Sequence, residues 1–404
     1  MNEKMKAAIA LTSKVQSVMR DVETRHIGRA DVVQATFLAL VSGRPAFFLG
    51  SPGTDKTGAV QDMARQIAGA VFYDVLMPTI VSVEQLLVES TSIEEASTAG
   101  GGKSIRTRDT LGRAALAHLL FADEIWKAEP RVLQTLIDLS KGDGVRHEGQ
   151  MVATPLLAFL AASNELPEAE GNLGAIWSRM TIRVVVNPLD RAGKNELVKA
   201  RLARATGGSK TATQTLTLAD IETLRTARKY VDIPQGVIDA VLDVYQELVD
   251  DKSTDFSWAW ADDRRFGRVF DVMQAKALLD GRTVVSKQDL AVLEWLLWDV
   301  PEHIPVVKAK LAPYCRTPFS DAQEAVDALL TPGGVVELVR NGDRVKGVQA
   351  ITQCEAALTE LKRLKGEADS GTSSRIADLV KQVEAVKDDV IAVVTGAKMP
   401  QRGN

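Results

Sequence analysis

The sequence predicts an α/β core with a parallel sheet flanked by helices, followed by an all-α domain and a helical C-terminal extension. Up to about residue 189, short apolar runs that end in polar residues alternate with helical segments. Continuous apolar strands that alternate with helices are typical of a parallel sheet covered on both faces. From about residue 190 to 305 the strand-like runs stop, and only helical periodicity remains.

Five apolar runs predict the strands of the core. Residues 1 to about 45 are expected to form helices, and the run AFFL after them ends in a glycine. A helix with Val60, Met63 and Ile67 on one side is expected next. The strands are expected at residues 46–49, 71–76, 117–122, 156–162 and 182–186. Ligands of open parallel sheets bind at the C-terminal ends of the strands, so the polar residues that follow these runs form the candidate site.

Three regions follow from this pattern: an α/β core over 1–189, an all-helical domain over 190–305 and an extension over 306–404. In the extension, residues 335–345 contain an Asn-Gly pair and predict a hairpin. The apolar spacing from Ile351 to Leu361 and from Ile376 to Val393 predicts two helices joined by a short break. We expect these two helices to form an antiparallel pair.

The composition describes a packed protein of more than one domain. Of 404 residues, 45% are hydrophobic and 25% charged, and the net charge is −4. This acidic balance provides no basic field for nucleic acid. The two cysteines show no metal-ligand spacing and suit a reducing cytoplasm. No stretch approaches the roughly 18 apolar residues of a membrane span, so we expect a cytoplasmic protein.

The stretch GSPGTDKT, directly after the first expected strand, differs at one position from the phosphate-loop pattern GxxxxGK[ST]. In that pattern, backbone N–H groups at the start of a helix surround the phosphates. The lysine reaches the outer phosphates, and the hydroxyl group ligates Mg²⁺. The alternative is a glycine-rich turn between strand and helix that binds nothing. The candidate cofactor-binding residues are Gly50, Ser51, Pro52, Gly53, Thr54, Asp55, Lys56 and Thr57.

Asp55 stands where the phosphate-loop pattern has a glycine. A carboxylate facing the phosphates at about 6 Å would cost roughly 3 kcal/mol at an effective dielectric constant of about 20. That cost would weaken binding about a hundredfold. We therefore expect the Asp55 side chain to point outward, where it can pair with a basic group on a neighbouring element or subunit.

Three polar residues at two later strand ends complete the candidate site. Asp123 and Glu124 follow the apolar run at 117–122, and Asn164 follows the run at 156–162. Asp123 is expected to hold Mg²⁺ and Glu124 to polarise the attacking water, while Asn164 orients that water or contacts the γ-phosphate. Taken alone, each is more often a solvated strand end or a turn residue. The phosphate loop upstream favours the catalytic interpretation.

The order of GSPGTDKT, LLFADEIWKAEPRVLQTLIDL and LAFLAASNELPEAEGNLGAIWSRMTIRV resembles the MoxR family of AAA+ ATPases. DEIWKA and AASNELPE resemble its RavA branch in particular. The resemblance covers residues 27–305 and implies an AAA+ P-loop core followed by an all-α lid domain. It also implies that an insert at 82–112 faces the pore of a ring and that residues 141–149 form a hairpin before the strand that ends at Asn164, although both could be surface loops.

The resemblance assigns further site residues. Arg179, in the motif WSRM, is expected to reach the γ-phosphate of the neighbouring subunit, the alternative being a surface salt bridge. Arg264, in the motif DDRRF, is expected to contact the nucleotide in cis, with Arg265 as the next candidate. His26 and Ile27 are expected to border the adenine.

The function that the resemblance implies is an ATP-hydrolysing, Mg²⁺-dependent ring motor with chaperone-like action on a client protein. A hexamer and a partner with a von Willebrand factor A domain are expected with it. Asp55 motivates one alternative, an ATP-gated assembly scaffold with poor turnover. The other alternative is a DNA-associated AAA+ motor, against which the acidic net charge argues.

Overall fold

The computed structural model describes most of the chain in two compact units, Met1–Leu311 and Ala312–Asn404. The expected boundary between residues 305 and 306 lies inside one helix, α13 (His303–Cys315). No helix of the described residues is both long and apolar enough to cross a membrane. The described residues are 3–96, 103–140, 144–147, 150–167, 173–203, 216–256, 262–316, 318–331, 333–340, 342, 344–367 and 370–396.

The first unit is built on a five-stranded parallel sheet in the order β10-β1-β9-β6-β3. The sequence placed each of these strands to within two residues. Because all five run parallel, the C-terminal ends of β1, β9 and β6 meet at one edge. The strands are β1 (Ala46–Leu49), β3 (Phe72–Leu76), β6 (Leu119–Asp123), β9 (Ala158–Ser163) and β10 (Ile182–Val185).

Helices cover both faces of this sheet. α1 (Glu3–Arg25) and α2 (Ala30–Ser42) precede it, and α2 packs directly on β1, β9 and β10. α3 (Lys56–Arg65) packs on β3 and β6. On the other face, Phe47 lies in a core with residues of α6 (Pro130–Ser140) and α7 (Leu173–Trp177). Each strand therefore needs apolar side chains on both sides, which explains the continuous apolar runs.

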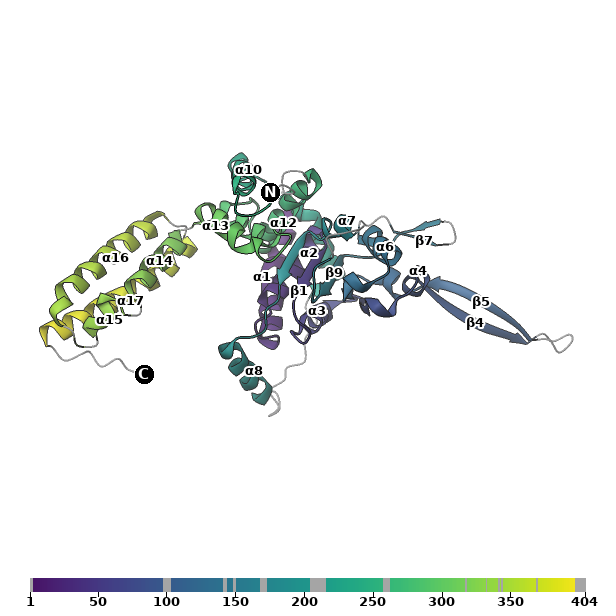
Figure 1. Ribbon diagram of the computed structural model, residues 1–404, viewed down its shortest axis with the longest axis horizontal. Helices are drawn as coiled ribbons and strands as arrows, with labels where there is room; N and C mark the ends of the chain where they lie inside the picture. Colours follow the sequence, from purple (N-terminus) through teal and green to yellow (C-terminus); the bar gives the residue numbers. More distant parts are fainter. Residues whose placement is uncertain are drawn as a thin grey trace. The chain divides into compact units, whose positions relative to one another are not determined.

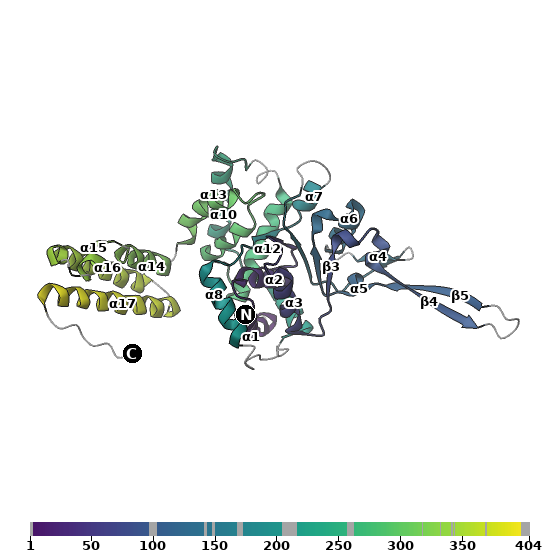
Figure 2. The same cartoon turned by 60° about the horizontal axis from the view of Figure 1, so that its bottom comes forward.

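Antiparallel strand pairs lie within the first expected insert and at the end of the second. In the first, β4 (Val88–Ala96) and β5 (Lys103–Leu111) form a ribbon between the short helices α4 (Val83–Leu87) and α5 (Arg113–Leu116). Figures 1 and 2 both show this ribbon projecting away from the sheet. In the second, β7 (Val145–His147) pairs with β8 (Gln150–Val152). Residues 97–102, 141–143 and 148–149 of these inserts lie outside the described part of the chain.

Beyond β10, the described residues of the first unit are mainly helical, as predicted, with a two-residue strand, β11 (Leu216–Thr217), beside β2 (Ile67–Ala68) and a β-bridge between Asp232 and Val284. Of its helices, α9 and α12 pack on α1 and α2. The described helices are α8 (Arg191–Ala203), α9 (Leu218–Arg228), α10 (Gln235–Asp250), α12 (Asp263–Leu279) and α13, with a 3-10 segment, η4 (Lys287–Trp295), before α13.

A buried ion cluster joins β10 to α12. The side chain of Arg183 on β10 is 0% exposed and that of Arg265 on α12 is 3% exposed, and both donate to the Asp299 carboxylate. Both guanidinium groups also donate to the Trp298 carbonyl. Burial disfavours the Asp299 anion and by itself would raise the pKa of Asp299. The charges and hydrogen bonds of Arg265 and Arg183 outweigh burial and leave the pKa lowered.

The second unit contains the predicted antiparallel helix pair, α16 (Gly347–Glu367) and α17 (Ser370–Thr395), together with α14 (Pro318–Leu329) and α15 (Val335–Arg340). The hairpin expected at 335–345 is wrong, because α15 occupies most of it. Val336 and Val339, three residues apart, are both buried in the core of the unit. Gly342, with φ of 109°, follows the helix, and its amide donates to the Val339 carbonyl.

Substituting Asp299→Ala tests the ion cluster. The change leaves two buried guanidinium groups without this carboxylate, so the free energy of unfolding should fall by about 3–5 kcal/mol. Urea unfolding followed by tryptophan fluorescence measures it. The control Lys308→Ala, at an ammonium group 57% exposed beside Glu294, should change stability by less than about 0.5 kcal/mol. Equal losses in both variants would contradict the assigned role of the cluster.

Candidate active site

The phosphate loop connects β1 to α3 and is fixed between two neighbouring strands. The Gly50 amide donates to the Ser163 carbonyl at 3.0 Å, and the Val186 amide donates to the Leu49 carbonyl at 2.7 Å. A Cβ atom on Gly50 would lie 2.4 Å from the Val186 carbonyl oxygen. Only glycine fits this close approach, which places the loop directly above the ends of β9 and β10.

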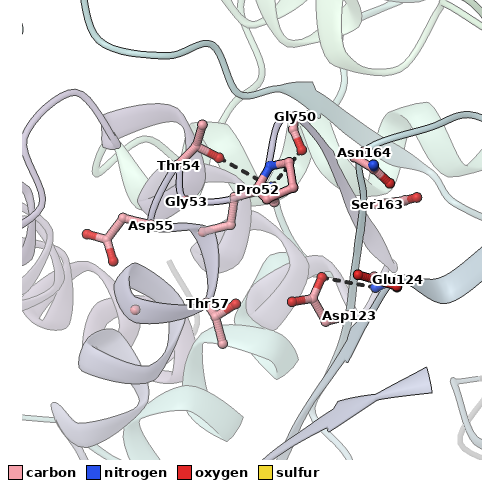
Figure 3. A pocket seen from close by; sticks show the side chains of 12 residues that line it. Gly50, Pro52, Gly53, Thr54, Asp55, Thr57, Asp123, Glu124, Ser163 and Asn164 are labelled. Atoms are coloured by element: carbon pink, nitrogen blue, oxygen red, sulfur yellow. Dashed lines mark hydrogen bonds between the residues drawn. The ribbon is translucent and has the colours of Figure 1, made fainter. Parts of the chain in front are cut away.

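The ends of β1, β6 and β9 surround a cavity of about 280 Å³. Figure 3 shows the loop residues on one side of it and Asp123, Glu124, Ser163 and Asn164 on the other. Ser51, His26, Ile27, Arg179 and Arg264 are not among its lining residues. The lining consists of Gly50, Pro52, Gly53, Thr54, Asp55, Lys56, Thr57, Gly58, Asp123, Glu124, Ser163 and Asn164.

Lys56 is held inside the loop. Its ammonium group donates to the carbonyls of Gly50 at 2.8 Å and Ser51 at 3.1 Å, and to the Thr54 hydroxyl at 3.2 Å. Burial lowers the pKa of Lys56, while the nearby Asp123 carboxylate works in the opposite direction. Phosphate oxygen atoms entering the loop would offer this cation stronger acceptors than neutral carbonyls do.

Thr57 and Asp123 lie on facing sides of the cavity (Figure 3). One carboxylate oxygen of Asp123 accepts the Glu124 amide at 3.0 Å. A hydroxyl and a carboxylate are hard oxygen ligands, which suit Mg²⁺ when phosphate oxygens and water complete the coordination. The described residues contain no group of three or more His, Cys, Asp or Glu that could hold a metal by themselves. The donor set therefore fits a magnesium ion that arrives with a nucleotide.

Backbone strain is concentrated at this cavity. In the described residues, the non-glycine residues with positive φ are Asp55 at 59° and Glu124 at 52°, and both line the cavity. Such conformations cost about 1–3 kcal/mol each and cluster at functional sites. The Glu124 carboxylate also pairs with the Lys127 ammonium group at 2.9 Å. The sequence analysis did not identify this pair, although the DEIWKA motif contains both residues.

Asp55 points away from the cavity centre (Figure 3), in the orientation expected from electrostatics. Its carboxylate lies 2.7 Å from Nδ1 of His26, and Nε2 of His26 lies 3.1 Å from the Asp62 carboxylate. Burial disfavours the His26 charge, yet hydrogen bonds and the negative charges of Asp55 and Asp62 raise the pKa of His26 to about 9. The imidazole is therefore protonated at neutral pH. Sequence reasoning did not identify Asp62, since no motif marks it.

Arg179 lies at the opposite edge of the sheet from the cavity. It precedes β10, whose first residue, Ile182, pairs with Ala46 at the start of β1, whereas the phosphate loop follows the end of β1. At about 3.3 Å per residue, the two ends of these strands are roughly 10 Å apart. Arg179 therefore does not enter the cavity of its own chain.

Arg264 does not line the cavity, and its expected contact with the nucleotide in cis stays a prediction. Arg264 is exposed in the first turn of α12. One turn later, Arg268 donates to the Ser178 carbonyl at 3.4 Å, next to Arg179. Burial and the charges of Arg44, Arg264 and Arg179 lower the pKa of Arg268 to about 10. Arg268 thus lies near Arg179, where the ion cluster around Asp299 joins α12 to β10.

Two protein-family models match this chain. A family model described as the MoxR domain in the MoxR-vWA-β-propeller ternary systems matches residues 13–226, which is more than half of the chain. The chain belongs to the MoxR family of AAA+ ATPases. A second model, the AAA lid domain, matches residues 236–311 of this MoxR protein.

Three related proteins are similar to this chain over different shares of its length. Two uncharacterised proteins of Methanocaldococcus jannaschii are each 23% identical, over 398 and 397 residues, and cover 95% of this chain and 97% and 100% of their own lengths. A structural protein of Acidianus two-tailed virus is 26% identical over 177 residues, which are 43% of this chain and 28% of that protein.

A crystal structure from Cytophaga hutchinsonii, described as a candidate ATPase, matches the fold with a TM-score of 0.55. It is 14% identical and covers 76% of this chain and 96% of its own. At that identity the match supports the fold alone. The resemblance of this MoxR protein to the RavA branch stays a prediction.

Substituting Asp55→Gly tests whether the loop charge repels phosphate. Because the carboxylate points to His26, affinity for an ATP analogue should change by less than about tenfold. Isothermal titration with Mg²⁺ and adenylyl imidodiphosphate measures this. A hundredfold gain would mean that the carboxylate faces the phosphates after all.

Proposed function

We propose that this MoxR-family protein is an ATP-hydrolysing ring motor that remodels or activates a client protein in a chaperone-like manner. The cavity lined by the phosphate loop together with Asp123, Glu124 and Asn164 is the observation that carries the proposal. These residues come from three strand ends and offer phosphate-binding, metal-binding and water-activating groups within one space. That combination suits phosphoryl transfer to water.

Each residue of the cavity has a distinct task in the proposed reaction. The bound Mg²⁺–ATP supplies the phosphoanhydride bond and a cation that neutralises its charge. The loop amides and Lys56 bind phosphate oxygen atoms, while Thr57 and Asp123 hold the cation. Glu124 accepts a proton from the attacking water, and Asn164 orients that water.

The active site is incomplete within one chain in this proposal. Arg179 lies at the far edge of the sheet from its own cavity, so it would serve the cavity of a neighbouring copy. A guanidinium group stays charged and offers a rigid fork of donors, which suits the charge that develops on the transferred phosphoryl group. Arg268, which donates to the Ser178 carbonyl beside Arg179, would approach the same neighbour. Head-to-tail contacts of this kind close into rings, and we propose a hexamer.

The proposed partners follow from the family description, which places MoxR domains with von Willebrand factor A and β-propeller proteins. We propose a partner with a von Willebrand factor A domain, in the cytoplasm, where the thiols of Cys315 and Cys354 would stay reduced. The ribbon of β4 and β5 is the proposed pore-facing element that moves when the nucleotide is hydrolysed.

The assembly scaffold with poor turnover loses its motivation from the orientation of Asp55, which turns its charge toward His26. The DNA-associated motor lacks support from the net charge of −4. It would be revived by DNA-stimulated hydrolysis that weakens steeply with salt.

Substituting Glu124→Gln tests hydrolysis. Loss of the general base should lower steady-state phosphate release by about 10²- to 10⁴-fold, while the ATP analogue still binds. The measurement is phosphate release with Mg²⁺–ATP, wild type against variant. A wild type that releases phosphate no faster than Glu124→Gln would favour the scaffold over the motor.

A mixing experiment tests the role of Arg179 in trans. Arg179→Ala and Glu124→Gln should each be inactive alone. In a one-to-one mixed ring, about one interface in four combines an intact Glu124 with an intact neighbouring Arg179, so activity should partly return. Phosphate release after mixing measures it, with gel filtration to verify that both variants assemble. If mixtures stay as inactive as the separate variants, Arg179 does not act across the interface.

A further inference from the structure

We propose that Asp55 and His26 form a latch that holds the phosphate loop in its binding conformation, and that Gly58 is present to make room for it. Asp55 and His26 are then positioning residues for nucleotide binding. The inference deepens the nucleotide site and therefore rests on the proposed function. It concerns the one place where this chain departs from the phosphate-loop pattern.

The backbone of Asp55 needs such a constraint. Asp55 has φ of 59° and ψ of 31°, in the left-handed region, and directly precedes α3. Glycine adopts this conformation without steric cost, whereas a Cβ atom disfavours it. Aspartate tolerates the left-handed conformation better than most residues, but its backbone energy is still less favourable there than in the right-handed region. An interaction of its side chain must therefore compensate for the missing glycine.

The His26 ring supplies that interaction from outside the loop. His26 lies between α1 and α2, and its two ring nitrogen atoms contact the residue just before α3 and a residue within α3. Nδ1 lies 2.7 Å from the Asp55 carboxylate and Nε2 lies 3.1 Å from the Asp62 carboxylate. Asp62 also accepts Arg25 Nε at 2.6 Å, and Arg25 pairs with Asp21. The protonated ring thus links the end of the phosphate loop to α1 through a chain of alternating charges.

Gly58 shows that the fold is built around the latch. A Cβ atom there would lie 2.2 Å from Oδ1 of Asp55 and 3.6 Å from Cε1 of His26. Glycine inside a helix weakens it relative to alanine, so its presence in the first turn of α3 needs a reason. The space that the Asp55 carboxylate occupies is that reason.

The latch lies at one end of the cavity. Figure 3 shows the Asp55 side chain turned away from Asp123, Glu124 and Asn164, the groups that face the outer phosphate. A nucleotide with its outer phosphate near Glu124 therefore has its nucleoside toward the latch. Loss of the latch should weaken the binding of the whole nucleotide rather than remove a reacting group.

A double-mutant cycle on the full-length chain tests the latch. Gly58→Ala alone should weaken binding of adenylyl imidodiphosphate with Mg²⁺ by about tenfold, because the new Cβ atom displaces the Asp55 carboxylate. Asp55→Gly alone removes the latch but also relieves the backbone strain, so it should weaken binding by only about threefold. In the double variant, Gly58→Ala should add less than about twofold. Equal effects of Gly58→Ala in both backgrounds would overturn the proposal.

His26 provides an independent cycle. His26→Gln should weaken binding about threefold in the wild-type chain and have no further effect in Asp55→Gly. Additive losses would overturn the latch. Asp55→Asn, which keeps an oxygen acceptor for the ring, should bind more tightly than Asp55→Ala. Without this rescue, the contact with His26 is not what holds the loop.

Two controls separate the latch from general stability and from the proposed function. Gly236→Ala, in open space at the start of α10, should leave affinity unchanged. The melting temperatures of the latch variants without nucleotide should stay close to that of the wild type, while their affinities for the analogue fall. A variant that loses melting temperature but keeps its affinity would overturn the positioning role. A wild type that binds no analogue would refute the nucleotide site. The latch would then be judged by whether Gly58→Ala lowers the melting temperature only when Asp55 is present.

Discussion

The carboxylate of Asp299, shared by two buried guanidinium groups, determines how the helical part of the first unit meets the sheet. Arg183 comes from β10 and Arg265 from α12, so the cluster packs the start of α12 against the N-terminal half of β10. Buried ion pairs add little net stability, but separating their members is costly, so they favour one arrangement over others. Here that arrangement places Arg268 beside Ser178 and so near Arg179. In the proposed ring, the division of the site between two edges of one sheet follows from it.

At the opposite edge, the direction of a side chain matters more than its charge. Asp55 would repel phosphate if it faced the cavity, yet its carboxylate pairs with His26 and lies over Gly58. The departure from the phosphate-loop pattern is therefore accompanied by two further residues, His26 before β1 and Gly58 in α3. No sequence motif identifies either one, because a glycine after Thr57 and a histidine at a helix end are both common. Their meaning comes from their contacts.

The strands and the cavity residues could be predicted because their signals are local. Strands buried on both faces produce continuous apolar runs, and the parallel-sheet rule then places Asp123, Glu124 and Asn164 at one edge. The position of Arg264 could not be predicted in this way, since it depends on contacts between β10 and α12 that no local pattern encodes. The hairpin predicted at 335–345 was wrong for a related reason. The valines of this segment fit a strand or a helix, and the burial of Val336 and Val339 against α16 and α17 favours the helix.

The ribbon of β4 and β5 has nine residues in each strand, and at about 3.4 Å per residue it is roughly 30 Å long. At the base of the ribbon, the Gly112 amide donates to the Leu87 carbonyl at 2.7 Å. A rigid rod fixed at its base amplifies rotation: a tilt of about 10° there would carry the far end of a 30 Å rod through roughly 5 Å. Rearrangements too small to disturb the packing of α4 and α5 would therefore become displacements longer than one residue of an extended chain.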